Sequence, residues 1–84
     1  MTYVYLLISE KNPAKIYIGQ TVDLKARLAQ HNRGESTYSK TYGPWRLETY
    51  VAFSDAKLAD SFEKYLKVGS GHAFMKKRLP PKPV

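Results

Sequence analysis

The 84-residue sequence contains no cysteine, and this absence excludes two ways of holding a small domain together. Neither a disulfide framework nor a cysteine-based zinc site can form. A chain of this length folds as one domain, because it buries only about 60% of its unfolded surface and cannot support two hydrophobic cores. We therefore expect any active site to be a surface cleft.

The sequence also lacks a long apolar run. No segment approaches the roughly 20 apolar residues that cross a membrane, and the N-terminal segment YVYLLIS lacks the flanks of a signal peptide. Together with the missing cysteines, this predicts a cytoplasmic protein with no membrane partner, present as a monomer or a weak homodimer. Hydrophobic residues make up 43% of the chain, which is typical of a globular domain.

Acidic residues are scarce. Seven Asp and Glu stand against 14 Lys and Arg, and Glu63 is the last acid, so the final 21 residues contain six basic residues and no acidic one. A field of one sign attracts phosphate backbones and weakens with salt. The alternative is a solvated face that keeps a small protein soluble. Because the charge is segregated and seven tyrosines accompany it, the sequence favours a nucleic acid as the partner.

Three segments have the composition and alternation of β-strands, namely Tyr3–Ser9, Lys15–Gln20 and Arg46–Phe53. A short loop around Asn12-Pro13 joins the first two, which predicts an antiparallel hairpin. Tyr3 and Tyr5 share one face of the first strand. Tyr17 joins that face only if the numbers of paired residues add to an even sum such as 24.

Helical periodicity follows the second strand and recurs after the third. The predicted helices run from Thr21 or Asp23 to Asn32–Gly34, from Ser54 or Asp55 to about Lys67, and from His72 to Leu79. Residues 34–45 contain several helix breakers, so we expect a loop there, and Val68-Gly69-Ser70-Gly71 should end the second helix. That helix should bury a stripe made of Leu58, Phe62, Tyr65 and Leu66.

The element order β-β-α-β-α-α predicts an α/β (α+β) fold, in which a small three-stranded, mainly antiparallel sheet is packed with helices. We expect this domain to cover residues 1–79. The proline-rich residues 80–84 should form a flexible C-terminal tail.

The first helix carries basic side chains on its apolar face. Leu24, Arg27, Leu28 and His31 lie at i, i+3, i+4 and i+7, so leucines and cations share one stripe. If this stripe packs on the strand that carries Tyr17, a polar cluster forms at the rim of the core. Arg27 can hold a phosphate and His31 can exchange a proton, although a surface arginine and a structural histidine are the ordinary alternatives.

Glu63 borders the apolar stripe of the second helix, whereas Asp60 and the lysines of that helix should point away. One carboxylate facing a basic cleft is a plausible partner for a magnesium ion, which keeps several waters and takes few protein ligands. The ordinary alternative is an ion pair with Lys67 at i+4. In the loop, Lys40 and Tyr42 could contact phosphate and stack on a base, or could simply form a polar loop tip.

Taken together, these residues resemble the GIY-YIG endonuclease family, in particular its small stand-alone members of the UPF0213 or URI type. Tyr3-Val4-Tyr5 corresponds to the first tripeptide and Tyr17-Ile18-Gly19 to the second, with Arg27, His31 and Glu63 at similar positions after them. The first tripeptide begins with tyrosine rather than glycine, which is familiar among stand-alone members. The resemblance covers nearly the whole chain.

The resemblance implies an endonuclease that hydrolyses phosphodiester bonds in DNA, with RNA as an alternative substrate, and that uses one Mg²⁺ or Mn²⁺ ion. Glu63 would bind the metal, Arg27 would hold the scissile phosphate, and Tyr17 would act as the general base for water. Tyr5 and His31 would orient the water or complete the hydrogen-bond network. Because no second domain is evident to read sequence, we expect selection by DNA structure.

Two departures from the family pattern favour an alternative function. Gln20 stands where some relatives carry an activating lysine, and no asparagine follows Glu63. The alternative is a nucleic-acid-binding module that keeps the fold with little or no cleavage, and a scaffold protein is a third hypothesis. The residues expected to contact nucleic acid are Lys40, Tyr42, Lys64, Lys67, Lys76, Lys77 and Arg78.

Overall fold

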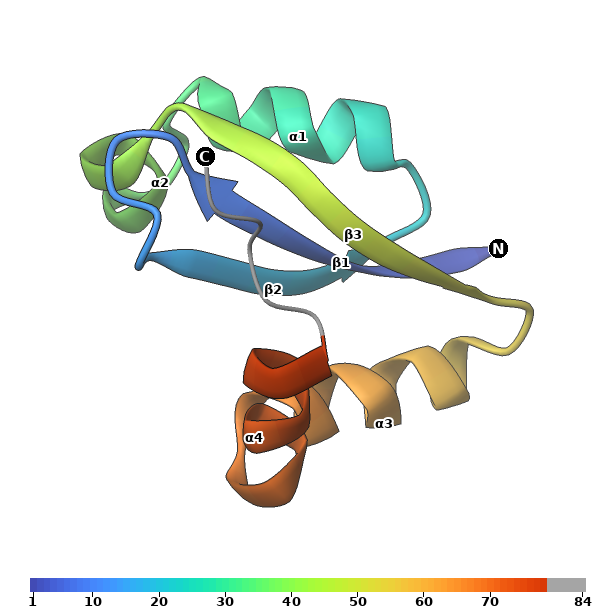
Figure 1. Cartoon of the computed structure of the whole chain (residues 1–84). Coiled ribbons are helices and arrows are strands. Elements are labelled where there is room, and N and C mark those ends of the chain that lie inside the picture. Colours follow the sequence, from blue (N-terminus) through green and yellow to red (C-terminus); the bar gives the residue numbers. More distant parts are fainter. Residues whose placement is uncertain (79–84) are drawn as a thin grey trace.

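The computed structural model describes residues 1–78, in which a three-stranded antiparallel sheet lies between two pairs of helices (Figure 1). The strands are β1 (Thr2–Ser9), β2 (Ile16–Thr21) and β3 (Trp45–Phe53), in the spatial order β2-β1-β3. The predicted hairpin and α+β class are therefore confirmed. Leu79 and the predicted tail over 80–84 lie outside the described residues.

The helices are α1 (Leu24–Asn32), α2 (Thr37–Tyr42), α3 (Ala56–Lys67) and α4 (Gly69–Arg78). Two aspartates cap the N-termini of α1 and α3, and both were among the caps that the sequence predicts. The Asp23 carboxylate accepts a hydrogen bond from the Ala26 N–H at 3.0 Å, and the Asp55 carboxylate accepts one from the Lys57 N–H at 2.8 Å. None of the described helices is both long and apolar enough to cross a bilayer.

The predicted loop over residues 34–45 is wrong, because it contains α2 and the order becomes β-β-α-α-β-α-α. The Ser36 hydroxyl caps this short helix by accepting from the Ser39 N–H at 3.1 Å. The indole N–H of Trp45 donates to the Ser39 carbonyl at 3.1 Å. A cap and a tertiary hydrogen bond thus stabilise a helix too short to show periodicity.

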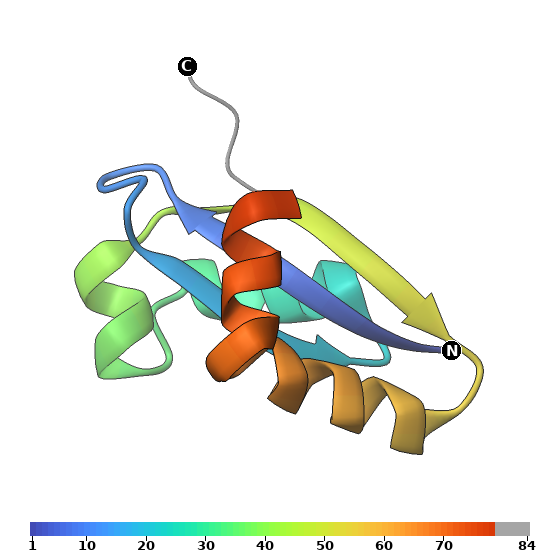
Figure 2. The same ribbon diagram turned by 60° about the horizontal axis from the view of Figure 1, so that its bottom comes forward.

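The glycine-rich segment after α3 was expected to end one helix, but it also begins the next. The third helix ends at Lys67, Val68 is its C-cap, and α4 begins at Gly69. A Cβ on Gly71 would lie 1.7 Å from the carbonyl oxygen of Tyr65. Gly71 therefore lets the first turn of α4 pack directly against the end of α3, as Figure 2 shows.

The two faces of β1 support two separate hydrophobic clusters. One lies on the side of the sheet that α3 and α4 cover, and the other on the side that α1 and α2 cover (Figure 1). On one face, Val4 and Leu6 pack with residues of α3 and α4, including Ala59, Leu66 and Met75. On the other face, Tyr5 and Leu7 pack with Trp45 and with residues of α1 and α2. The alternation of side chains along β1 thus divides the molecule into two layers.

The register of the hairpin pairs Tyr5 with Gly19 and Leu7 with Tyr17, so the numbers of paired residues add to 24. Tyr17 therefore joins the face of β1 that carries Tyr3 and Tyr5, which is the even-sum alternative. This register sets Tyr5 of the first tripeptide and Tyr17 of the second against α1 and α2.

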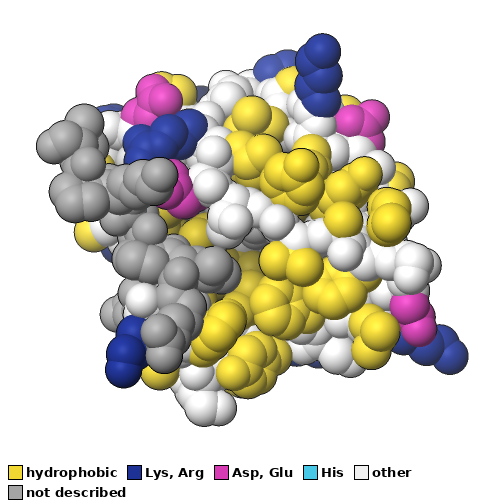
Figure 3. All heavy atoms as spheres, turned by 45° about the vertical axis from the view of Figure 1, so that its right-hand side comes forward, with side chains coloured by type: hydrophobic (Ala, Val, Ile, Leu, Met, Phe, Trp, Pro, Cys, Tyr) yellow, Lys and Arg dark blue, Asp and Glu magenta, His cyan; other side chains and the backbone are white. Residues whose placement is uncertain are grey.

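The stripe predicted for α3 is partly wrong. Leu58 is 58% exposed and Tyr65 is 44% exposed, whereas Ala59 is fully buried. The helix is rotated so that the small Ala59 side chain meets the sheet, which permits closer packing than Leu58 would. Figure 3 brings forward the side on which β3 ends and α3 begins, and exposed hydrophobic side chains are visible across it.

Candidate active site

Tyr5 and Tyr17 lie side by side because Gly19 has no side chain. A Cβ on Gly19 would be 2.5 Å from the Tyr5 hydroxyl oxygen and 3.1 Å from the Tyr17 ring. The Tyr5 hydroxyl therefore lies over Gly19, and its ring is stacked near the Tyr17 ring, with centroids 6.3 Å apart and planes 17° apart. Gly19 is thus required for the close approach of the two rings.

His31 of α1 contacts both tyrosines. Its Nε2 lies 3.1 Å from the Tyr5 hydroxyl oxygen, and its ring centroid lies 4.4 Å from that of Tyr17. Its Nδ1 lies 3.0 Å from the Ser39 hydroxyl oxygen, which in turn accepts a hydrogen bond from Ser36 at 2.9 Å. A hydrogen-bonded chain therefore runs from buried Tyr5 through His31 and Ser39 to the exposed Ser36.

Burial keeps Tyr5 and His31 uncharged near neutral pH. Desolvation, with smaller effects of the nearby Tyr17 and Glu63, raises the pKa of Tyr5 to about 12 despite the opposing charge of Arg27. Desolvation first and the Arg27 charge second lower the pKa of His31, against a weaker opposing effect of Glu35. These two side chains therefore offer hydrogen bonds rather than charge.

Arg27 and Glu63 supply the charges, and they come from opposite layers of the fold. Arg27 of α1 lines a cavity of about 160 Å³ together with Tyr17, His31 and Glu35. Glu63 of α3 has a side chain that is 15% exposed and forms an ion pair with Lys67 at 2.5 Å, which is the i+4 alternative raised from the sequence. Both charges nevertheless act on the Tyr5 hydroxyl.

Comparison with known protein families shows which family has this arrangement of residues. Residues 1–77 match the family described as the GIY-YIG catalytic domain. The chain belongs to the GIY-YIG family. The resemblance predicted from the two tripeptides is therefore confirmed, and the match extends over both layers of the fold.

This GIY-YIG domain is similar to three curated proteins. It is 39% identical over 59 residues to the structure-specific endonuclease subunit slx1 of Schizosaccharomyces japonicus, covering 66% of this chain and 22% of the relative. It is 38% identical over 65 residues to the structure-specific endonuclease subunit SLX1 homolog of Giardia intestinalis, covering 70% and 18%. It is 34% identical over 68 residues to a UPF0213 protein of Clostridium perfringens, covering 80% and 71%.

The chain thus spans about a fifth of the length of the two endonuclease subunits and about seven tenths of the UPF0213 protein. No solved structure matches it significantly.

The second tripeptide of the GIY-YIG domain is followed by Gln20, whose side chain turns toward α3. Its amide N–H donates to the Asp60 carboxylate at 2.9 Å, and the same carboxylate pairs with Lys64 at 2.8 Å. The prediction that Asp60 points away from the fold is therefore wrong. The reason is that α3 packs on β2, which brings the first half of the helix against the end of the strand.

The lysines expected to contact nucleic acid are distributed over both layers of the GIY-YIG domain. Lys40 is exposed on α2 and Lys77 on α4, while Lys64 and Lys67 form ion pairs with carboxylates of α3. The side chains of Lys76 and Arg78 lie outside the described part of the structure.

Tyr42 was expected at the tip of a polar loop, but it belongs to α2 and is half-buried. Its ring packs against Tyr38, with centroids 5.0 Å apart, and the Lys15 ammonium lies 5.3 Å from the ring centroid. The Tyr42 ring therefore contributes to the packing of α2 on the sheet.

Glu63 is the carboxylate of this domain that could hold a metal ion. No group of three or more His, Cys, Asp or Glu side chains that could form a metal site occurs among the described residues. A lone carboxylate fits Mg²⁺ or Mn²⁺, because such an ion keeps several waters and takes substrate phosphate oxygens as further ligands. The Lys67 ammonium occupies the same carboxylate and must be displaced when an ion binds.

Ser39 is a residue of the site that sequence reasoning missed. It is 3% exposed, and its hydroxyl holds the Nδ1 side of His31. The signal that could have found it is the spacing of Ser36 and Ser39, since a serine cap is often bonded three residues into a helix. The helix breakers of residues 34–45 predict a loop instead, and a loop does not indicate a serine cap.

Proposed function

We propose that this domain is an endonuclease that hydrolyses phosphodiester bonds in DNA, depends on one Mg²⁺ or Mn²⁺ ion, and selects its substrate by DNA structure. One observation carries the proposal. Arg27, Tyr17 and His31 line one cavity, and the Tyr5 hydroxyl is hydrogen-bonded to His31 at its wall. The names of two relatives, which are structure-specific endonuclease subunits, support the choice of reaction and substrate.

Arg27 is the proposed phosphate-binding residue. Its guanidinium lines the cavity that also contains the Tyr17 ring, and a guanidinium binds two phosphate oxygens at once. Its fixed charge would stabilise the negative charge that builds up on the phosphate as water attacks. A metal ion held by Glu63 would supply a second positive charge at the phosphate.

Tyr17 is the proposed general base for the attacking water, because its ring lines the same cavity as Arg27. Tyr5 is a poor base by comparison, since a pKa of about 12 keeps its proton in place at neutral pH. Tyr5 would instead orient the water through its hydroxyl, and His31 would complete the hydrogen-bond network that holds this hydroxyl. Ser39 would hold the imidazole ring in the orientation that this requires.

Cleavage of labelled flap, gapped and four-way DNA, compared with a linear duplex of the same sequence, tests the proposal. We expect cleavage of the branched substrates that requires Mg²⁺ or Mn²⁺ and that falls by about a hundredfold or more in Arg27→Ala. Glu63→Gln should show a similar loss. Matched controls are Lys25→Ala on α1 and Asp60→Asn on α3, which should cleave at the wild-type rate.

Two outcomes would refute the proposal. One is undiminished cleavage in the presence of EDTA, and the other is full activity of Glu63→Gln when circular dichroism shows a folded variant. The same set of substrates made of RNA decides whether DNA is the preferred nucleic acid.

A second candidate function is a nucleic-acid-binding module without turnover, and one observation favours it. The side chain of Gln20 is held by Asp60, and Lys67 neutralises Glu63, so neither is free in this structure to assist chemistry. This alternative predicts saturable DNA binding that weakens steeply with salt, and no product at any metal concentration. Binding that is insensitive to salt would exclude it.

A further inference from the structure

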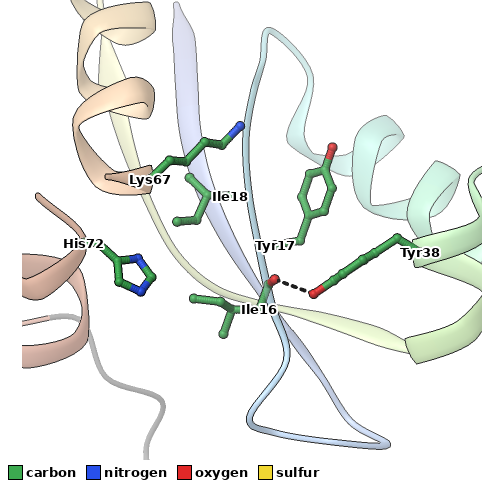
Figure 4. Close-up of a pocket in the computed structure, with 6 residues that line it drawn as sticks. All are labelled: Ile16, Tyr17, Ile18, Tyr38, Lys67 and His72. Carbon is green, nitrogen blue, oxygen red and sulfur yellow. Dashed lines mark hydrogen bonds between the residues drawn. The ribbon is translucent and has the colours of Figure 1, made fainter. Parts of the chain in front are cut away.

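A larger cavity, of about 340 Å³, lies along the edge strand β2. Tyr17 lines both this cavity and the one that contains Arg27. The other walls of the larger cavity come from both layers of the fold (Figure 4). Tyr38 of α2 lies on one side, and Lys67 of α3 and His72 of α4 lie on the other. We call it the β2-edge cavity. Its size is in the range of cavities that bind small organic groups.

The walls of the β2-edge cavity are mainly apolar and aromatic. Ile16 and Ile18 form its floor, and the Tyr17 and Tyr38 rings lie toward α2 (Figure 4). The Lys67 side chain extends past Ile18, and its ammonium, which pairs with Glu63, is the cation that a bound anion would share. The cavity therefore suits a flat aromatic group that is attached to an anion.

Polar groups at the strand edge add hydrogen-bonding capacity. The Tyr38 hydroxyl donates to the Ile16 carbonyl at 3.0 Å, so this carbonyl points away from β1. Because backbone groups alternate in direction along a strand, the N–H and C=O of Ile18 also face the free edge. A donor and an acceptor thus lie together at the floor of the cavity.

His72 provides an independent sign of a missing ligand. Its Nδ1 is buried and has no hydrogen-bond partner among the described residues. A buried polar atom without a partner is costly, and most such atoms in folded proteins are paired with protein, water or a ligand.

We propose that the β2-edge cavity binds an unstacked nucleobase of the DNA strand that is cut, next to the scissile phosphate. The inference rests on the proposed endonuclease function, because it places the base beside Arg27 through the shared Tyr17. A base has aromatic faces for Tyr38 and polar edges for Ile18 and His72, and the phosphate attached to it reaches Lys67.

This occupant explains how the domain would select its substrate by DNA structure. A base leaves the stack at little cost only where DNA is gapped, mismatched or branched, whereas in a continuous duplex unstacking costs energy. The cavity would therefore favour such sites. Every base has an aromatic face, so the cavity predicts little preference for sequence.

The test compares two branched DNAs that differ only at the junction, where one has an unpaired base and the other an abasic residue. Binding is measured in EDTA, so that cleavage does not interfere. We expect the wild type to bind the DNA with the base about tenfold more tightly. His72→Trp, which fills the cavity, should bind both DNAs equally. Phe74→Trp introduces the same side chain at a 38% exposed position of α4 and should keep the tenfold preference.

A second measurement begins with the wild type, so that its main result does not depend on the folding of a variant. Titration with thymidine 5′-monophosphate should shift the NMR signals of the Tyr38 ring and the His72 imidazole in a saturable manner. Lys57→Ala, at an exposed lysine in the first turn of α3, should not change this titration, whereas Lys67→Ala should weaken it.

The outcomes separate this inference from the proposed function. Equal affinity of the wild type for the two DNAs, or no saturable binding of either, would overturn the nucleobase site even if the domain cleaves branched DNA. A preference for the unpaired base without any cleavage would support the site and refute the endonuclease function.

Discussion

Substitution of Gly19 by alanine gives the sharpest test of how the candidate active site is built. The Cβ would lie 2.5 Å from the Tyr5 hydroxyl oxygen, whereas an ordinary contact begins at 3.4 Å. The hydroxyl would therefore have to move by about 0.9 Å. Tyr5 is only 3% exposed, so its ring has little room, and the movement should break its hydrogen bond with His31.

The expected loss of stability follows from three effects. Forcing a methyl group into a packed core costs about 1–3 kcal/mol. Loss of a buried hydrogen bond adds about 0.5–1.5 kcal/mol. Replacing glycine by alanine in a strand returns about 0.5–1 kcal/mol, because the unfolded chain is less flexible. Gly19→Ala should thus lower the free energy of unfolding by about 2 kcal/mol, and the melting temperature of a domain of this size by about 10 °C.

Urea unfolding of a double-mutant cycle isolates the cause. In a Tyr5→Leu background the ring that occupies the space is gone, so Gly19→Ala should be neutral or slightly stabilising there. The coupling free energy between the two positions should accordingly be about 2 kcal/mol. An equal loss of stability in both backgrounds would show that the Tyr5 ring is not the obstacle, and no loss in the wild type would refute the placement of the ring over Gly19.

Three further predictions concern protonation and the core. Burial and the charge of Arg27 lower the pKa of His31, so the unfolded chain binds the proton at a higher pH than the folded chain does. The free energy of unfolding, measured in urea, should therefore fall as the pH drops below about 6.5. His31→Gln should remove this part of the decrease. Because burial raises the pKa of Tyr5 to about 12, ultraviolet titration should reveal one tyrosine that ionises near pH 12 and is absent from Tyr5→Phe. Met75 is 1% exposed, so Met75→Ala should cost about 2–5 kcal/mol in thermal unfolding, and Phe74→Ala, at a 38% exposed position, clearly less.

The hairpin shows where sequence reasoning was sufficient and where it was not. Two strand-like segments around Asn12-Pro13 predict antiparallel pairing without further information. The register does not follow, because the first strand is apolar on both faces and gives no preference for one alignment. The pairing of Tyr5 with Gly19 becomes necessary only once the ring must occupy the space above a residue without a side chain.

Errors in the helices have a related cause. The short helix α2 depends on the Ser36 cap and on the hydrogen bond from the Trp45 indole to the Ser39 carbonyl, which comes from another element. Hydrophobicity alone also ranks Leu58 above Ala59, although the helix buries the alanine. In both cases tertiary packing outweighed the local pattern.

The grouping of Glu63 with Arg27 has a different basis, because no periodicity relates a residue of α3 to one of α1. From its own helix, Glu63 could be assigned a magnesium ion or an ion pair with Lys67, and the ion pair is present. The two layers are connected at β2, where the missing side chain of Gly19 leaves space for the Tyr5 hydroxyl. A Cβ at this position would displace the Tyr5 hydroxyl and break its hydrogen bond with His31, so the tripeptide that ends in Gly19 determines the hydrogen-bonded part of the site.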